Sequence, residues 1–348
     1  MNKILLSEIN QSCRVTTRSA ELRQSNFFES FDEETFIYDI FQSSNKTYLI
    51  APPSKPEVWD YFFNLATFDG KKIHDINYSF YKNKVSKLII HFPVNEIKWG
   101  DKFIRPRSRV ATNKINNAVY TLQKNNDLTW IKDWANWYIN NHAVDSVIIY
   151  DNSSEAYSLE ELRKQLFTLN AQVILESVPF KYGPGAYKGS AWDSDFLQYA
   201  MFEHARYFYM ENNGVFINAD IDELLVTNND QPISTKLTEN HNCISYIGKW
   251  VHLDPDLLHD SIITHYSHNR LDLEKNCPAK WTANLGLLPD NAFLKVHEIQ
   301  GENVKPINTQ EAIYLHHKQI STNWKANRKE ISPESSKFPK YSNISEIL

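Results

Sequence analysis

Two aspartates near the middle of the chain follow a short apolar run. Phe216 and Ile217 lead through Asn218 into Asp220 and Asp222. In an extended backbone the side chains at positions i and i+2 point to the same side of the strand. Two hard oxygen donors there suit a divalent cation such as Mn²⁺ or Mg²⁺, which in turn neutralises a diphosphate. The D-x-D pattern therefore predicts a metal–diphosphate site, although acidic pairs also cap helices or face solvent.

A second group of polar residues follows two other apolar runs. Thr121, Lys124 and Asn125 lie at the end of the run 118–122, and Asp151 and Asn152 directly follow the run 147–150. Polar groups on loops after strands can hydrogen-bond a ribose or a base, yet the same residue types are ordinary turn formers. The pattern alone leaves both interpretations open.

The elements that must position these residues alternate between strands and helices. Short apolar strands are expected at 118–122, 147–150, 173–175 and 214–217. Between them, helices are expected from Asp127, from the capping box of Ser158 and Glu161, and from Asp193 toward Tyr209. This succession predicts an α/β fold, with a mostly parallel sheet and helices on both faces. Ligands bind such sheets outside the carboxyl ends of the strands.

The chain before this region has a different pattern. Alternating runs at 35–41 and 46–50, and a hairpin formed by 77–81 and 85–92, predict strands. We therefore divide the chain into a β-rich accessory module over 1–107, an α/β domain over 108–330 and a polar tail over 331–348.

Composition limits the classes of partner and compartment. The chain has 348 residues and a net charge of -5. It therefore lacks the excess of basic residues expected of a nucleic-acid-binding protein. Three distant cysteines without C-x-x-C spacing favour a reducing compartment. No apolar run approaches the roughly 20 residues of a membrane span, and the apolar start is too short for a signal peptide. We expect a cytoplasmic protein, with the Lys- and Arg-containing tail offering peripheral contact to the inner face of a membrane.

The motifs, in this order, resemble a known group of enzymes. The succession 121–126, 130–134, 144–154, Gln198 and 220–223 is similar to the glycosyltransferase family 92 and family 2-like group of GT-A enzymes, over about residues 115–330. The resemblance implies a GT-A fold and a metal-dependent, inverting transfer of a sugar from a nucleotide sugar, typically a UDP-sugar. It also implies an acceptor hydroxyl on a glycan or a lipid-linked molecule.

The resemblance also implies site residues. Those expected to contact the nucleotide sugar are Thr121, Lys124, Asn125, Asp151, Asn152, Gln198 and Lys280. Those expected to hold the cation are Asp220, Asp222 and His316. The candidates for the base that takes the acceptor proton are Glu223, His297 and Asp254. The chain departs from the pattern at Asn126, where an acidic residue is usual, and at His317, where a tyrosine is usual.

Other aromatic and histidine side chains are weaker candidates for the site. Three tryptophans near predicted strand ends or loops could stack on a sugar face: Trp192, Trp250 and Trp281. Four histidines are expected to be structural or exposed: His252, His259, His265 and His268.

Two other functions fit parts of the pattern. An apolar strand followed by D-x-D also describes a haloacid-dehalogenase-like phosphotransferase, in which Asp220 would attack phosphorus and Asp222 would act as acid and base. The motif follows three β-α units and continues as Glu223–Leu224, which argues against that function. The other alternative is a non-catalytic carbohydrate-binding protein on the same fold, which the missing acidic residue at Asn126 favours.

Overall fold

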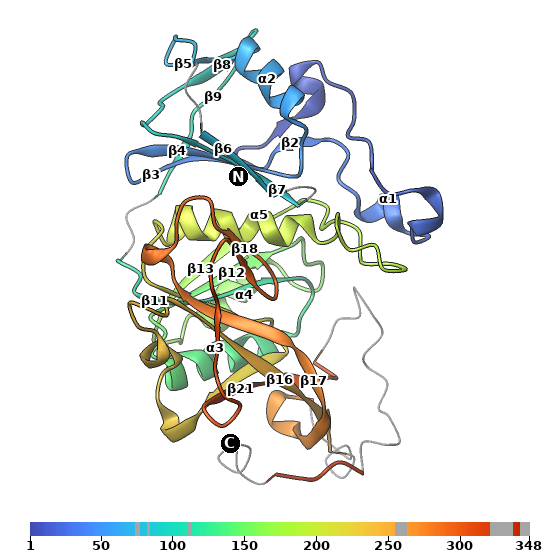
Figure 1. Ribbon diagram of the computed structural model, residues 1–348, viewed down its shortest axis with the longest axis vertical. Coiled ribbons are helices and arrows are strands. Elements are labelled where there is room, and N and C mark those ends of the chain that lie inside the picture. The colour runs from blue at the N-terminus through green and yellow to red at the C-terminus, as the bar shows by residue number, and fades with distance from the viewer. Residues whose placement is uncertain (74–76, 82–83, 110–112, 255–262, 321–336, 342–348) are drawn as a thin grey trace. The chain divides into compact units, whose positions relative to one another are not determined.

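The chain divides into two compact units in the computed structural model (Figure 1). The structure describes residues 1–73, 77–81, 84–109, 113–254, 263–320 and 337–341. The first unit comprises Met1–Asn113 and Pro179–Asn212, and the second comprises Lys114–Val178 and Asn213–Leu348. The segment 179–212, which the sequence assigned to the α/β domain, is thus grouped with the N-terminal module.

The N-terminal module is rich in strands. Its five-stranded sheet has the order β10 (Arg107–Ser108), β3 (Asp39–Ser43), β4 (Lys46–Ala51), β7 (Val85–Ile90) and β6 (Asn77–Tyr81). The smaller sheets are β1 (Ile4–Leu5) with β2 (Thr35–Ile37), and β5 (Thr67–Phe68) with β8 (Ile97–Trp99) and β9 (Lys102–Ile104). The antiparallel pair β6 and β7 is the hairpin that the sequence predicts.

The α-helices in the described part of the first unit are α1 (Phe27–Ser30), α2 (Pro56–Leu65) and α5 (Phe196–His204). The sequence reading did not predict α2, although Pro56 at its first turn is a known start signal. Helix α5 belongs with this unit because it packs against β4 and β7, where Lys87 and Glu203 form a fully buried ion pair at 2.8 Å. Asp193 does not cap α5 as predicted, since Asp195 occupies the N-cap and Asp193 pairs with Arg18.

The second unit is built on one large mixed sheet. Its strands in spatial order are β13 (Gln172–Ser177), β12 (Ser146–Asp151), β11 (Asn117–Gln123), β14 (Val215–Asn218), β17 (His268–Asn284), β16 (Cys243–Leu253), β21 (Ala312–His317) and β15 (Glu223–Thr227). Strand β20 (Lys305–Pro306) pairs with β16, and β18 (Phe293–Leu294) pairs with β19 (Ile299–Gln300) in a separate hairpin.

The α/β class predicted from the sequence is confirmed, and the sheet is more mixed than predicted. Strands β13, β12, β11 and β14 are parallel neighbours, as the β-α succession requires. Strand β17 then joins β14 in antiparallel orientation, and β16 and β17 form a long antiparallel pair. Between β16 and β17 the structure describes one 3-10 turn, at His265–Ser267.

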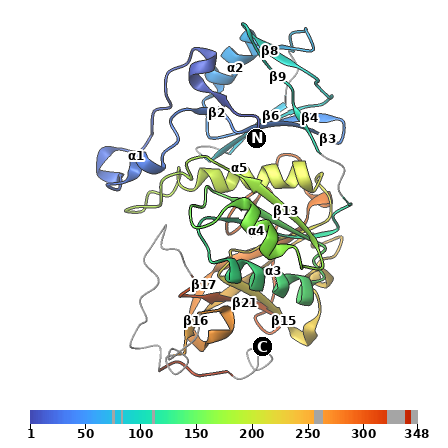
Figure 2. The same ribbon diagram turned by 180° about the vertical axis from the view of Figure 1, so that it is seen from behind.

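Helices α3 (Leu128–His142) and α4 (Leu159–Leu166) lie on the same face of the large sheet (Figure 2). The side chain of Asp127 caps α3, and Ser158 and Glu161 form the predicted capping box of α4. The prediction that helices cover both faces of the sheet depended on a third helix, α5. The structure groups α5 with the first unit.

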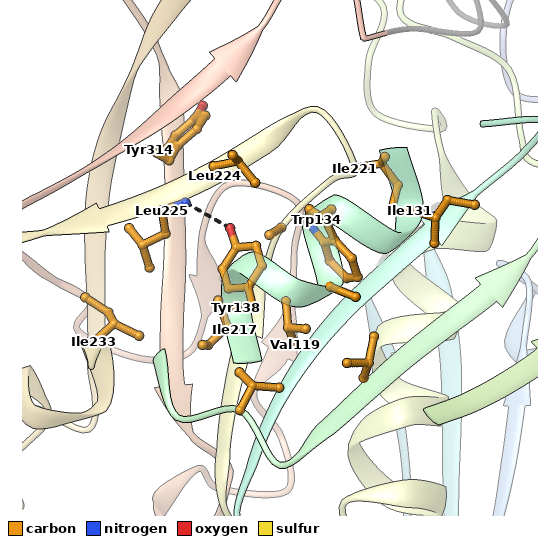
Figure 3. Close-up of a cluster of buried hydrophobic side chains, with 14 of the residues drawn as sticks. Val119, Ile131, Trp134, Tyr138, Ile217, Ile221, Leu224, Leu225, Ile233 and Tyr314 are labelled. Carbon is orange, nitrogen blue, oxygen red and sulfur yellow. Dashed lines mark hydrogen bonds between the residues drawn. The ribbon is translucent and has the colours of Figure 1, made fainter. Parts of the chain in front are cut away.

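The core under these helices reaches the acidic motif. Trp134 and Tyr138 of α3 are buried among apolar side chains of β11, β14 and β15 (Figure 3). The Tyr138 hydroxyl accepts a hydrogen bond from the Leu225 amide and donates one to the Glu223 carbonyl, each at 3.1 Å. The first residues of β15 are thereby fixed to α3. Within the described residues, no helix has the length and hydropathy to cross a membrane.

Candidate active site

The acidic motif forms a tight turn between two strands. Strand β14 ends at Asn218 and β15 begins at Glu223. The Glu223 amide donates to the Asp220 carbonyl at 3.0 Å, and the Asp220 amide donates to the Glu223 carboxylate at 2.9 Å. The prediction of an extended backbone through the motif is therefore wrong, because the chain must reverse here to enter β15.

The two aspartates of the turn contact different cationic side chains. The carboxylate of Asp220 lies 2.8 Å from the ammonium of Lys280 on β17. The carboxylate of Asp222 lies 3.0 Å from Nε2 of His316 on β21. Glu223 lies between these pairs, with Oε2 3.0 Å from Lys280 Nζ and Oε1 4.0 Å from His316 Nδ1. Three carboxylates and two cationic side chains thus form one continuous cluster.

Burial and neighbouring charges shift the titration of this cluster. Burial is the main cause that raises the pKa of Glu223 to about 7, against the opposing effect of Lys280. Burial alone would lower the pKa of Lys280, but Asp220 and Glu223 raise it above its ordinary value. Burial also acts to lower the pKa of His316, and the ion pair with Asp222 outweighs it and raises this pKa to about 10. His316 is therefore an imidazolium at neutral pH unless a cation displaces its proton.

The cluster contains a group of side chains that fits a divalent cation. Asp222, Glu223 and His316 each offer one ligand atom, and these atoms lie within 4.8 Å of one another. Carboxylate oxygens with an imidazole nitrogen suit Mn²⁺ and also bind Mg²⁺. The structure brings together two of the three predicted metal ligands, Asp222 and His316. It adds Glu223, which the sequence placed among the candidate bases, whereas Asp220 is outside the group and contacts Lys280.

Three further residues contact the turn or His316, and the sequence did not single them out for this role. His265 Nε2 donates to the Ile221 carbonyl at 2.7 Å, and the backbone amide of His317 donates to the Asp222 carbonyl at 2.8 Å. The ring of Trp250 stacks on the His316 imidazole, with centroids 4.1 Å apart and an interplanar angle of 22°. His259 lies outside the described residues, while Trp281 is fully buried and cannot stack on a sugar.

The predicted nucleotide loops meet at one edge of the sheet. Gln123 at the end of β11 is opposite Asp151 at the end of the parallel strand β12. The Asn125 amide donates to the Ser154 hydroxyl at 2.7 Å, and that hydroxyl donates to Asp151 at 2.6 Å. The Asp151 carboxylate also accepts hydrogen bonds from Gln123 and from the Ser154 amide. Asp151 therefore organises its own loop, and any contact with a ribose would compete with these bonds.

The other predicted nucleotide contacts differ in their accessibility. Asn152 is buried and donates to the Val178 carbonyl at 2.7 Å, and the Thr121 side chain is buried within β11. Lys124 is partly exposed in the loop after β11. The ammonium of Lys280 is engaged by Asp220 and Glu223. Gln198 belongs to α5 of the first unit, where it accepts a hydrogen bond from Tyr182.

The two remaining base candidates lie in different surroundings. Nδ1 of His297 donates to the Ala279 carbonyl at 3.0 Å, next to Lys280 in the sequence. The neighbouring Val296 carbonyl accepts a hydrogen bond at 2.8 Å from Asn218, two residues before Asp220. His297 is exposed close to the acidic turn.

Asp254, in contrast, is buried and ion-paired. Its carboxylate contacts Arg270 at 3.2 Å and Lys340 at 2.8 Å. Lys340, which lies in the predicted polar tail, therefore has a structural partner. The adjoining tail segments 331–336 and 342–348 lie outside the described residues.

No protein-family model matches this chain, and no curated protein has a significantly similar sequence.

Proposed function

We propose that the chain is a metal-dependent glycosyltransferase of the GT-A type that uses a nucleotide-sugar donor. One observation carries the proposal. Strands β12, β11 and β14 are parallel neighbours, so their carboxyl ends place the 151–154 loop, the 124–126 loop and the acidic turn along one sheet edge. A candidate site for a divalent cation next to polar loops, at the carboxyl ends of these strands, supports the binding of a nucleoside diphosphate.

Each part of the edge has a role in the proposed site. Asp222, Glu223 and His316 would hold the cation, which supplies positive charge to the diphosphate leaving group when it is bound. Lys280 holds Asp220 and Glu223 in place through two short ion pairs. The exposed atoms of the 124–126 and 151–154 loops would contact the nucleoside. The donor class follows the family resemblance, with a UDP-sugar as the first candidate.

The proposed reaction is a displacement at the anomeric carbon. The acceptor oxygen forms a bond to that carbon while the bond to the diphosphate oxygen breaks, and the diphosphate keeps the electron pair. The acceptor proton must pass to a base. Glu223 and Asp254 are engaged in buried ion pairs, so we assign this role to His297, an exposed imidazole whose Nδ1 donates to the Ala279 carbonyl. The acceptor would be a hydroxyl of a glycan or a lipid-linked molecule.

Turnover of nucleotide sugars tests this proposal. The purified chain is incubated with a panel of nucleotide sugars and simple acceptors, with Mn²⁺ or with a chelator, and release of the nucleoside diphosphate is followed. We expect release with one donor class, only in the presence of Mn²⁺, and its loss in Asp222→Asn. The matched control is Asp230→Asn, because Asp230 is an exposed aspartate elsewhere in the second unit.

Other outcomes would contradict the proposal. A phosphorylated Asp220 formed from a phosphate ester would indicate the phosphotransferase alternative. Binding of a plain sugar with the same affinity in the absence of Mn²⁺ and nucleotide, and without turnover, would indicate a carbohydrate-binding protein.

A further inference from the structure

The first unit contains a cavity of about 470 Å³ that the proposed transferase site does not use. All of its lining residues belong to Met1–Asn113 or to Pro179–Asn212. One wall is the continuous segment 11–17, and the rest of the lining includes residues of α2, β7 and the start of α5. Its volume lies within the range of small-molecule sites, roughly 300–1,000 Å³.

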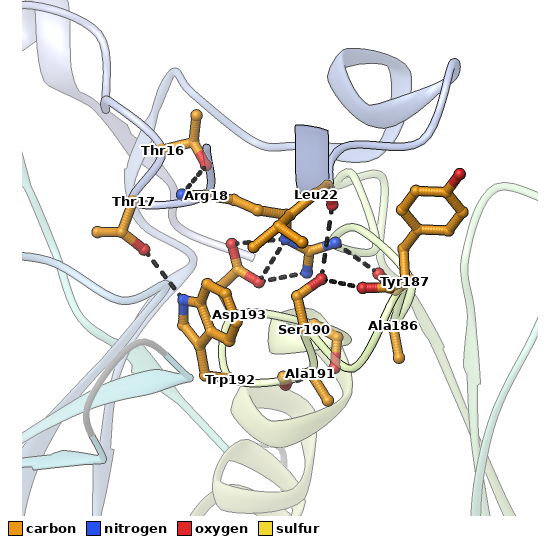
Figure 4. A network of polar contacts seen from close by, with 12 residues as sticks. Thr16, Thr17, Arg18, Leu22, Ala186, Tyr187, Ser190, Ala191, Trp192 and Asp193 are labelled. Atoms are coloured by element: carbon orange, nitrogen blue, oxygen red, sulfur yellow. Dashed lines mark hydrogen bonds and ion pairs between the residues drawn. The ribbon is translucent and has the colours of Figure 1, made fainter. Parts of the chain in front are cut away.

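Two arginines fix the wall formed by residues 11–17. Arg14 Nε donates to the Pro53 carbonyl at 2.8 Å, and its Nη2 donates to the Thr35 carbonyl at 2.6 Å. Arg18 follows the wall and pairs with Asp193, with Nε 2.9 Å from Oδ1 (Figure 4). The two guanidinium groups thus anchor the segment both within the wall and directly after it.

The interior of the cavity is mainly apolar. Phe31, Val85 and Phe196 line it and are themselves buried in the first unit. Val58 of α2 and Leu6 extend this surface, so a ligand that fills the cavity must carry an apolar portion. Such a portion is stabilised by about 25 cal/mol for each Å² of apolar surface that it removes from water.

Three charged side chains line the cavity, Arg14, Lys55 and Asp193, which gives the lining an excess of positive charge. The carboxylate of Asp193 is neutralised by Arg18. Lys55 is exposed at the cavity and forms no ion pair with any part of the chain that the structure describes. Its ammonium is therefore available to a carboxylate or a phosphate group that enters with the apolar portion.

We propose that this cavity binds a small amphipathic anion, with its apolar chain between α2 and β7 and its charged head at Lys55. The ligand class follows from two properties of the lining: an apolar interior, and the Lys55 ammonium, which forms no ion pair with the described residues. This site is separate from the acidic cluster, and it does not depend on the transferase proposal.

The exposed thiol of Cys13 reports on occupancy, because Cys13 lines the cavity while Cys243 and Cys277 are buried. The rate at which iodoacetamide alkylates Cys13 is measured by mass spectrometry with octanoate, with its uncharged counterpart octanamide, and with acetate. We expect octanoate to slow alkylation at least threefold with a saturable dependence on concentration. Octanamide should need a concentration several-fold higher, and acetate should have no effect.

Two variants separate the charge from the apolar contact. Lys55→Glu should raise the octanoate concentration for half-protection at least fivefold and leave that for octanamide unchanged. The matched control Lys71→Glu, at an exposed lysine outside the cavity, should behave as the parent. Val58→Trp should abolish protection by both ligands, with circular dichroism confirming the fold.

The proposal is overturned if octanoate gives no saturable protection. It is also overturned if acetate protects as well as octanoate, if octanamide protects equally, or if Lys55→Glu leaves octanoate protection unchanged.

Discussion

A buried histidine at the end of α3 should make the second unit sensitive to mild acid. His142 is 1% exposed, and its Nε2 donates to the Leu225 carbonyl at 2.9 Å. Nδ1 lies 3.4 Å from the Ile233 amide and accepts its hydrogen. The neutral ring therefore satisfies one donor and one acceptor, and a second proton would face the Ile233 N–H. Burial lowers the pKa of His142 to about 4.

The sign and size of the effect follow from this pKa. The folded-state pKa lies below the unfolded value of about 6.5. At a pH between these two values, the unfolded chain binds a proton at His142 and the folded chain does not. The contribution of neutral His142 is complete above pH 6.5 and is lost as the pH falls toward 4. Between pH 7.5 and pH 5 the loss is about 2 kcal/mol, because one pKa unit corresponds to about 1.4 kcal/mol.

The assay compares the parent with His142→Gln, whose amide offers a donor and an acceptor and does not titrate. Urea unfolding is followed by tryptophan fluorescence at pH 7.5 and at pH 5. The unfolding free energy of the variant minus that of the parent should be about 2 kcal/mol larger at pH 5 than at pH 7.5. The other buried histidines are the same in both proteins, so their titration cancels in this difference. An identical pH dependence in the parent and the variant would refute the reasoning.

Three further predictions concern the second unit. Gly248→Ala should destabilise the fold by about 1–3 kcal/mol, measured by urea unfolding, because a Cβ would lie 2.3 Å from the buried ring of Tyr314; a variant as stable as the parent would contradict this. Mn²⁺ binding should release a proton near pH 7, seen as a buffer-dependent heat in calorimetry, because the paired His316 has a pKa of about 10 and must be neutral to bind a metal; a heat independent of the buffer would exclude His316 as a ligand. Deletion of residues 337–348 should lower Tm by roughly 5 °C, because it removes the Phe338 ring stacked on His252 and the backbone bonds to β17; an unchanged Tm would show that this contact does not stabilise the unit.

Local signals predicted the helices and parallel strands of the second unit well. Asp127 and the capping box of Ser158 mark the starts of α3 and α4, because the side-chain bonds that satisfy the first amides are formed within a few residues. Asp193 has the same residue type but pairs with Arg18, which is 175 residues away in the sequence. A cap formed by neighbours is visible in the sequence, whereas an ion pair between distant segments is not.

The candidate site was predicted in part for the same reason. The apolar strand before Asp220 and Asp222 places the motif at the carboxyl end of β14, which the sequence shows directly. The division of the two carboxylates between Lys280 and His316 depends on the order of β17, β21 and β15 in the sheet. That order is set by long-range pairing, so no local pattern could show that Glu223 joins Asp222 in the metal-binding group.

The most direct test of the account is calorimetric binding of UDP with and without Mn²⁺ to the parent, to Asp222→Asn and to the matched control Asp230→Asn. Asp222 offers a ligand atom to the candidate metal group and Asp230 is exposed elsewhere in the unit, so the two substitutions remove the same charge from different surroundings. We expect Mn²⁺-dependent UDP binding to the parent and to Asp230→Asn, and at least a tenfold weaker affinity in Asp222→Asn with the fold preserved. UDP binding that needs no Mn²⁺, or equal affinity in all three proteins, would contradict a metal–diphosphate site at the acidic turn.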